Sequence, residues 1–133
     1  MNDERGMMHK KNSNTMKENV VRNKSFQFSL RIISLCHFLT EHKKEFLLSK
    51  QILRSGTSIG ANIREADNAE SKPDYIHKMG IAQKEADETL YWLDLLMESS
   101  IITREQYQPL KTDCDELLRI IKSIIISAKN KPK

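Results

Sequence analysis

The ten residues RSGTSIGANI, at positions 54–63, place two glycines among small hydroxylated side chains. This composition is typical either of a phosphate-binding loop or of a helix that passes very close to a neighbour. The preceding residues EFLLSKQILR (45–54) have helical periodicity, and no Lys–Ser/Thr pair follows Gly60, as a phosphate-binding loop requires. One apolar stripe, which includes Ile52 and Ile59, runs straight through the segment. The sequence therefore predicts a helix in close contact with another element.

The two glycines need a structural reason, because each glycine inside a helix costs about 1 kcal/mol relative to alanine. Close approach of another backbone, or of a large side chain, would provide that reason. We expect Trp92 to fill the groove that the glycines leave. The residues predicted to pack helices or subunits together are Gly56, Ile59, Gly60, Asn62, Tyr91 and Trp92.

Four amphipathic segments, separated by short polar breaks, account for most of the chain. They run from about residue 20 to 40, 45 to 68, 71 to 97 and 103 to 128. Ser71 is a typical helix N-cap and Pro73 suits a first helical turn. The residues TREQ (103–106) form a capping box, in which the first and last side chains each bond the other's backbone N–H. These signals mark the starts of the third and fourth helices.

Short connections decide the arrangement of the helices. Helices of about 18–28 residues joined by about 3–6 residues pack as antiparallel neighbours. The predicted fold is all-α, an up-down-up-down antiparallel four-helix bundle over residues 19–129. Residues 1–18 are polar and lack periodicity, so we expect a disordered basic extension. Residues 130–133 are expected to be a basic tail.

The apolar residues exceed what one bundle core can bury. Successive helical residues lie about 100° apart, so Ile124, Ile125 and Ile126 spread over about 200°. Ile81 and Leu95 likewise lie off the core line of the third segment. Exposed apolar patches mark interfaces, although a tight core with a few stray surface isoleucines would give the same pattern. We expect a homo-oligomer.

The formal net charge of +4 is unevenly distributed. Residues 1–24 carry six lysines and arginines against three acids, and residues 119–133 carry five and no acid. The body between them has 11 bases and 15 acids. A basic composition favours nucleic-acid contact. Here that argument applies first to the two ends of the chain.

Other features of the sequence limit the classes of protein to which the chain can belong. No apolar stretch approaches the ~20 residues that cross a bilayer, and the polar start MNDERGMMHK is not an export signal. Cys36 and Cys114 lie among apolar residues without metal-ligand spacing, which is typical of buried, reduced thiols. We expect a cytoplasmic protein with no membrane partner, no metal and no cofactor.

Residues 49–96 resemble a known family, above all in LRSGTSIGANI (53–63) and DYIHKM (74–79). The family is that of the small helical-bundle proteins encoded in intervening sequences of bacterial 23S rRNA genes. It also includes the accessory variability determinant proteins of diversity-generating retroelements. The resemblance extends more loosely from Ser25 to Lys129. It implies a bundle that assembles into a barrel-like homopentamer.

For the retroelement branch, the resemblance further implies binding of nucleic acid and of a reverse transcriptase through a basic barrel surface. The body of this chain is acidic, whereas those proteins are strongly basic. Five residues are the candidates for such contact: Lys43, Lys50, Arg54, Arg64 and Lys78. The first three recur at spacings of seven and four, so we place them on one face of the second helix.

An oligomer would repeat that basic face in every subunit and bind phosphates through counterion release. An ordinary solvated helix face would show the same pattern. The predicted function is therefore a non-enzymatic oligomeric accessory or scaffold protein that contacts RNA, DNA or a nucleic-acid enzyme. The alternative is a purely protein–protein structural oligomer with no nucleic-acid role.

Two enzyme classes deserve comparison with the sequence. Arg31-x5-His37 has the spacing found in helical HEPN-type ribonucleases, but six residues along a helix leave the side chains about 120° apart. Only pairing across a dimer would bring such groups together. Asp74-x-x-His77 has the carboxylate-x-x-His spacing of di-iron bundles, which need a second copy and two further glutamates. We expect no catalytic site.

Two glutamates on the third segment, Glu85 and Glu88, suggest acid/base chemistry when they are considered with Tyr91. No nucleophile–base pair or oxyanion site accompanies them. We interpret the two carboxylates as polar partners of an arginine or of Asn62, at a boundary between helices or subunits.

Overall fold

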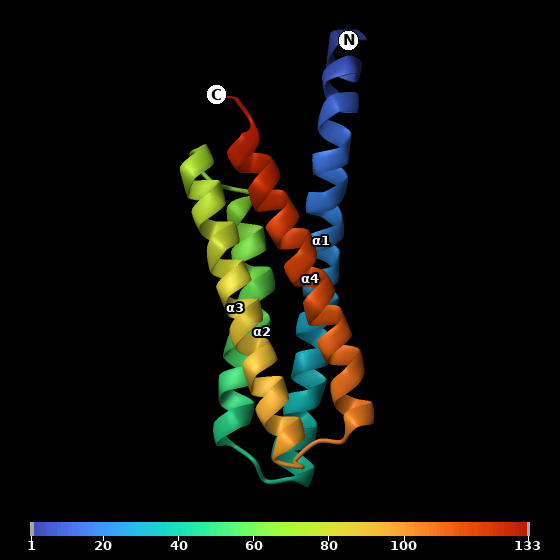
Figure 1. The fold of residues 1–133 in the computed structure, drawn as a ribbon, viewed down its shortest axis with the longest axis vertical. Helices are drawn as coiled ribbons and strands as arrows, with labels where there is room; N and C mark the ends of the chain where they lie inside the picture. The colour runs from blue at the N-terminus through green and yellow to red at the C-terminus, as the bar shows by residue number, and fades with distance from the viewer. Residues whose placement is uncertain (1, 133) are drawn as a thin grey trace.

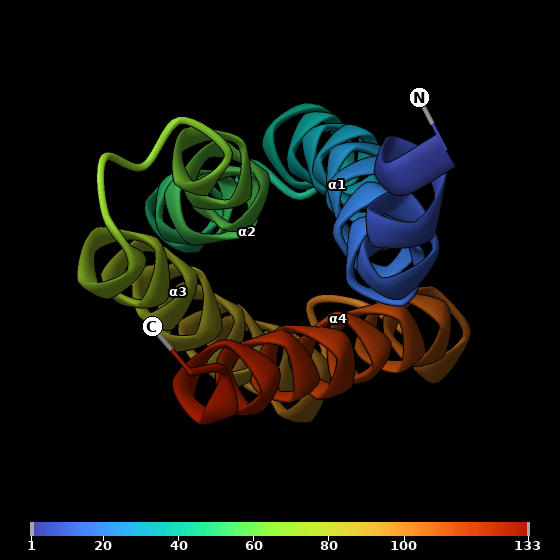
Figure 2. The same cartoon turned by 90° about the horizontal axis from the view of Figure 1, so that it is seen from above.

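Four long helices make up the chain. A computed structural model describes the backbone of residues 2–132 and the side chains of residues 15–132. The helices are α1 (Asn2–His42), α2 (Leu47–Ala66), α3 (Lys72–Glu98) and α4 (Arg104–Asn130). They alternate in direction, and each packs on its neighbours in chain order until α4 returns to α1 (Figure 1; Figure 2). The predicted all-α, up-down-up-down four-helix bundle is confirmed.

The predicted helix starts are confirmed at α3 and α4. The Ser71 hydroxyl accepts a hydrogen bond from the backbone N–H of Asp74, at 3.2 Å. The capping box joins Thr103 and Gln106 in both directions, with donor–acceptor distances of 3.1 and 2.9 Å. Each cap satisfies N–H groups that the first helical turn leaves without an intrahelical partner. The two starts therefore fix where the connections end.

The core follows the apolar stripes that define the segments. The largest fully buried side chains are Val21, Phe28, Ile32, Leu39, Ile52, Ile59, Met79, Thr89, Leu93, Leu96, Leu117 and Ile121. Of the residues expected off the core line, Leu95 and Ile126 are exposed, whereas Ile81 is half-buried. The surplus of apolar residues is therefore partly at the surface.

The N-terminal part of α1 differs from the disorder expected for residues 1–18. The helical backbone continues to Asn2, and its first turns extend beyond the other three helices (Figure 1). Once a helix is nucleated on the bundle, each added residue gains a hydrogen bond without a new nucleation cost. Within the described side chains, Val21 is the first core residue, and the domain boundary at residue 19 stays a prediction.

Both cysteines are buried and reduced. The Cys36 thiol donates to the Ser49 carbonyl at 3.3 Å, and the Cys114 thiol donates to the Ala86 carbonyl at 3.4 Å. Burial raises the pKa of Cys36 to about 11 and that of Cys114 to about 12. The thiols stay protonated at neutral pH, and a protonated buried thiol is a poor nucleophile.

In the described part of the chain, no helix is long and apolar enough to span a bilayer.

Candidate functional site

The two glycines of RSGTSIGANI lie inside α2 and face α1. A Cβ atom at Gly56 would lie 2.9 Å from Cγ1 of Ile32, and one at Gly60 would lie 3.3 Å from Oγ of Ser25. Neither glycine has a positive φ. The predicted close helix contact is confirmed. The expected occupant of the groove is wrong: α1 fills it, because the glycine side of α2 faces away from Trp92 of α3.

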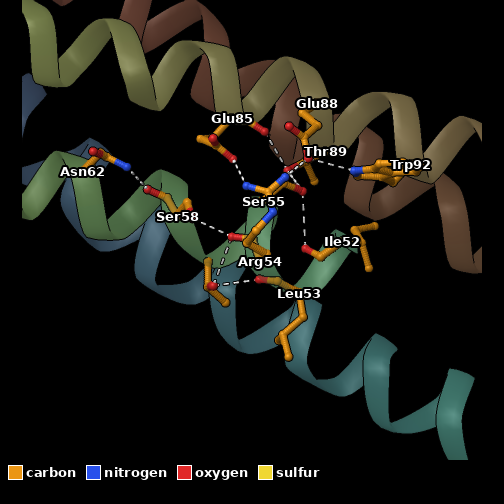
Figure 3. A network of polar contacts seen from close by, with 11 residues as sticks. Ile52, Leu53, Arg54, Ser55, Ser58, Asn62, Glu85, Glu88, Thr89 and Trp92 are labelled. Atoms are coloured by element: carbon orange, nitrogen blue, oxygen red, sulfur yellow. Dashed lines mark hydrogen bonds and ion pairs between the residues drawn. The ribbon is translucent and has the colours of Figure 1, made fainter. Parts of the chain in front are cut away.

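The opposite side of α2 carries a polar network with α3, which we name the Arg54 cluster: Arg54, Glu85, Glu88 and Trp92 (Figure 3). The Arg54 guanidinium pairs with Glu85 at 3.1 Å and also with Glu88. The Trp92 indole N–H donates to the Glu88 carboxylate at 3.0 Å. The prediction that Glu85 and Glu88 partner an arginine at a helix boundary is confirmed.

A buried hydrogen bond lies beneath the Arg54 cluster. The Thr89 hydroxyl donates to the Ser55 hydroxyl at 2.9 Å, and both side chains are fully buried. Asn62 does not join the cluster, since its amide donates to the Ser58 carbonyl of its own helix at 2.8 Å (Figure 3). The hydrogen bond between Ser55 and Thr89 fixes the register between α2 and α3, and the cluster holds the Trp92 ring in place at the surface.

The Arg54 cluster is not suited to bind phosphate by itself. Its two carboxylates outnumber its one guanidinium, so its formal charge is negative. Trp92 contacts Tyr91 edge-on, with ring centroids 5.1 Å apart. Tyr91 is 57% exposed. An exposed tyrosine beside a fixed tryptophan and an arginine has the composition of a protein–protein contact.

The predicted basic face of the second helix is only partly assembled. Lys43 lies in the connection between α1 and α2, because α2 begins at Leu47, and its ammonium lies 5.9 Å from the centre of the Phe38 ring. The placement of Lys43 on the second helix is therefore wrong. Lys78 pairs with Glu65 at 3.8 Å.

Of the other three candidates, Arg54 is engaged by two glutamates, and Lys50 and Arg64 are exposed on α2. The proposed nucleic-acid contact of all five residues stays a prediction. The ion pairs of Arg54 and Lys78 lower the positive charge that this surface offers to a phosphate.

A second basic surface lies on α4, and the candidate residues chosen from the sequence do not include it. We name it the α4 stripe: Arg119, Lys122 and Lys129. Their spacings of three and seven place them on one helix face, and all three are exposed. Within the described residues, no acid forms an ion pair with any of them. The acid-free run of residues 119–133 was the signal in the sequence.

The residues compared with enzyme motifs do not converge within one subunit. Arg31 pairs with Asp113 of α4, whereas His37 is exposed to solvent. The Asp74 carboxylate accepts a hydrogen bond from the backbone N–H of Glu70 at 3.3 Å and so belongs to the start of α3. Among the side chains that the structure describes, no group of three or more His, Cys, Asp or Glu residues could hold a metal ion.

Comparisons with known proteins agree with this architecture. A family model described as 23S rRNA-intervening sequence protein matches residues 17–123, which span parts of α1 and α4 and all of α2 and α3. The crystal structure of a protein of unknown function, from the S23 ribosomal protein family of Bacteroides thetaiotaomicron, is 55% identical to this chain. The alignment covers 83% of this chain and 98% of that one, with a TM-score of 0.82. Among curated proteins there is no significant match. The chain belongs to the 23S rRNA-intervening sequence protein family.

Proposed function

We propose that the protein is a non-enzymatic scaffold that works as a homo-oligomer. The observation that supports this proposal is the concentration of exposed apolar side chains on two separate faces. The first, which we name the α1 face, consists of Phe26, Leu30 and Ile33. Spacings of four and three place these residues on one stripe that points away from the core, and Phe26 is 50% exposed. A stripe of this kind on a helix marks an interface.

The second apolar surface, which we name the α2–α3 face, consists of Leu47, Tyr91, Trp92 and Leu95. Leu47 is 80% exposed and lies two turns before Ser55 on α2. Since Ser55 bonds Thr89 and the helices are antiparallel, Leu47 lies level with the last turns of α3. This face contains the tyrosine and tryptophan that protein interfaces favour.

The two faces lie on different sides of the bundle, since α1 and α3 are diagonal to each other (Figure 2). A subunit with two unlike faces associates head to tail, and such contacts form a closed ring when the rotation between subunits closes. The homopentamer implied by the family resemblance is a ring of this kind. We propose that the α1 face of one subunit packs on the α2–α3 face of the next.

Substitution of one face at a time tests this proposal by light scattering coupled to gel filtration. The wild-type chain is expected to elute at a multiple of its 15.5 kDa mass. Leu30→Asp and Leu95→Asp are each expected to reduce the assembly to monomers, because a carboxylate cannot be desolvated there without a partner. Gln108→Asp adds a carboxylate to an exposed position of α4, on neither apolar face, and is the control. A wild-type chain that is monomeric at micromolar concentration would exclude the proposal.

A second function, contact with RNA or DNA, is favoured by the α4 stripe. We expect this contact to be independent of sequence and sensitive to salt, because the stripe offers charge without base-reading geometry. Replacing all three residues of the α4 stripe with glutamine should lower the slope of log affinity against log salt by about 2–3. Glutamines at Lys44, Lys84 and Arg104, which are also exposed and belong to neither set of candidate residues, are the control. If the wild-type chain retards neither RNA nor DNA at low salt, the purely protein–protein alternative holds.

A further inference from the structure

A large cavity opens at the end of the bundle where the α2–α3 connection meets the end of α4. Its volume is about 1150 Å³, and all four helices or their ends contribute to its lining. Ligand pockets in proteins have volumes of roughly 300–1,000 Å³. The cavity is therefore large enough for a cofactor-sized molecule. It lies apart from the α1 face and from the Arg54 cluster.

The floor of the cavity is apolar. Ala66, the last residue of α2, and Ile124, in the last two turns of α4, are core residues, and Pro73 and Tyr75 add the first turn of α3. Tyr75 is half-buried, so its ring forms part of the wall. Burial, and after it the neighbouring Glu18 carboxylate, raise the pKa of Tyr75. The Tyr75 hydroxyl is therefore protonated at neutral pH and can donate a hydrogen bond. The ring of the same residue offers a surface on which a flat ligand can stack.

The charges around this floor are separated. Glu18 and Asp67 come from α1 and the end of α2, and Arg22 holds Asp67 at 3.0 Å. Lys72 and Lys129 come from the start of α3 and the end of α4, and Lys131 follows α4. Seen from above, α1 and α2 lie across the bundle from α4 and the start of α3 (Figure 2). The cavity thus takes its two carboxylates from α1 and the end of α2, and its three lysines from α3, α4 and the residues after α4; the Lys72 ammonium also donates to the Lys131 carbonyl.

The geometry points to a phosphorylated nucleoside as the ligand of this cavity, either a free nucleotide or the phosphorylated end of a strand. A phosphate monoester carries a charge of about −1.5 to −2 at neutral pH. It therefore matches three ammonium groups better than a ligand with a single carboxylate would. The flat base would lie over the apolar floor and Tyr75. Its amino groups would reach the carboxylates of Glu18 and Asp67 on the far side.

Ligands of other chemistry match the cavity less well. A fatty acid would lay an apolar chain against Glu18 and the Arg22–Asp67 ion pair, and it would desolvate these charges without forming hydrogen bonds to them. Inorganic phosphate would use the ammonium groups alone and leave the apolar floor empty. The nucleotide site goes beyond the proposed scaffold function, since it does not need self-association. It shares Lys129 with the α4 stripe and does not need Arg119 or Lys122.

Calorimetric titration of the full chain with AMP tests the inference, with adenosine and inorganic phosphate as parallel probes. AMP is expected to bind about tenfold more tightly than either fragment, because charge-assisted hydrogen bonds and apolar contact act together only in the whole ligand. Lys72→Gln is expected to weaken AMP binding about fivefold or more. Ala69→Trp, at the lining, is expected to fill the cavity and abolish binding.

Lys122→Gln is the matched control, since Lys122 belongs to the α4 stripe but does not line the cavity. It should weaken RNA retardation while leaving AMP binding unchanged, which separates a failure of this inference from a failure of the nucleic-acid proposal. Competition by a trinucleotide with a 5′-phosphate, and not by its 5′-hydroxyl form, would assign the site to strand ends. Competition by neither would assign it to free nucleotides.

Three results would overturn the inference. The first is the absence of binding heat at millimolar AMP, and the second is equal affinity for AMP and inorganic phosphate. The third is unchanged AMP binding by folded Ala69→Trp, with folding checked by circular dichroism. If Ala69→Trp does not fold, unchanged affinity of Lys72→Gln for AMP overturns the inference instead.

Discussion

Replacing Gly56 with alanine tests whether α2 packs on α1 as closely as the structure places it. The added Cβ would lie 2.9 Å from Cγ1, 3.0 Å from Cγ2 and 3.3 Å from Cβ of Ile32. Real Cβ atoms essentially never lie within 3.0 Å of such a neighbour, and the first of these distances is below that limit, so an atom must move. Ile32 is fully buried and branched at Cβ, so it has little rotamer freedom with which to give way.

The size of the effect follows from two opposing contributions. Overpacking of a core costs about 1–3 kcal/mol, whereas alanine gains about 1 kcal/mol over glycine in a helix. Gly56→Ala should therefore lower the free energy of unfolding by about 1 kcal/mol. Gly80, in α3, has no atom within 4 Å of its added Cβ, so Gly80→Ala should raise that free energy by about 1 kcal/mol. The two variants are expected to differ by about 2 kcal/mol.

Urea unfolding followed by far-ultraviolet circular dichroism measures this difference, with the protein concentration held fixed because assembly adds to apparent stability. Gly60→Ala should fall between the other two variants, since its Cβ would lie 3.3 Å from the small Ser25 side chain. In an Ile32→Ala background, the cost of Gly56→Ala should disappear. If Gly56→Ala stabilises the chain as much as Gly80→Ala does, the close contact is refuted.

Two further predictions concern the Arg54 cluster and the cysteines. Arg54→Met should lower the free energy of unfolding by about 1 kcal/mol or less, because Arg54 is half-exposed and solvent screens its ion pairs. A double-mutant cycle with Glu88→Gln, measured by urea unfolding, should show coupling between the two residues. Strict additivity would contradict the pairing. Because burial raises the pKa values of Cys36 and Cys114 above 9, their contribution to stability is complete below that pH. It should be lost as the pH rises toward 11–12, and a Cys36→Ala/Cys114→Ala variant should lack this loss between pH 8 and 10.5.

The fold could be predicted from the sequence because its signals are local. Apolar spacing of three and four defines the helices, and the caps at Ser71 and Thr103 define two of their starts. The same local signals identify Gly56 and Gly60 as contact residues. Which neighbour fills their groove depends on how the helices are arranged in space, and for that reason the sequence does not reveal Ile32 and Ser25 as the partners.

The candidate site was less predictable because its properties depend on partners distant in sequence. Arg54 belongs to a basic pattern along the chain, but Glu85 and Glu88 neutralise it from across a helix interface. Lys43 fits the same pattern only if the second helix begins before it, and α2 begins four residues later. The cavity gave no sequence signal, because its lining comes from all four helices or their ends.

Mixing the two face variants is the most direct measurement of head-to-tail association. Leu30→Asp lacks the α1 face and Leu95→Asp lacks the α2–α3 face, so an equimolar mixture retains one intact pair of complementary faces. The two monomeric variants are expected to form a one-to-one dimer on mixing, at twice the 15.5 kDa mass by light scattering. A mixture that stays monomeric while the wild-type chain assembles would contradict head-to-tail association.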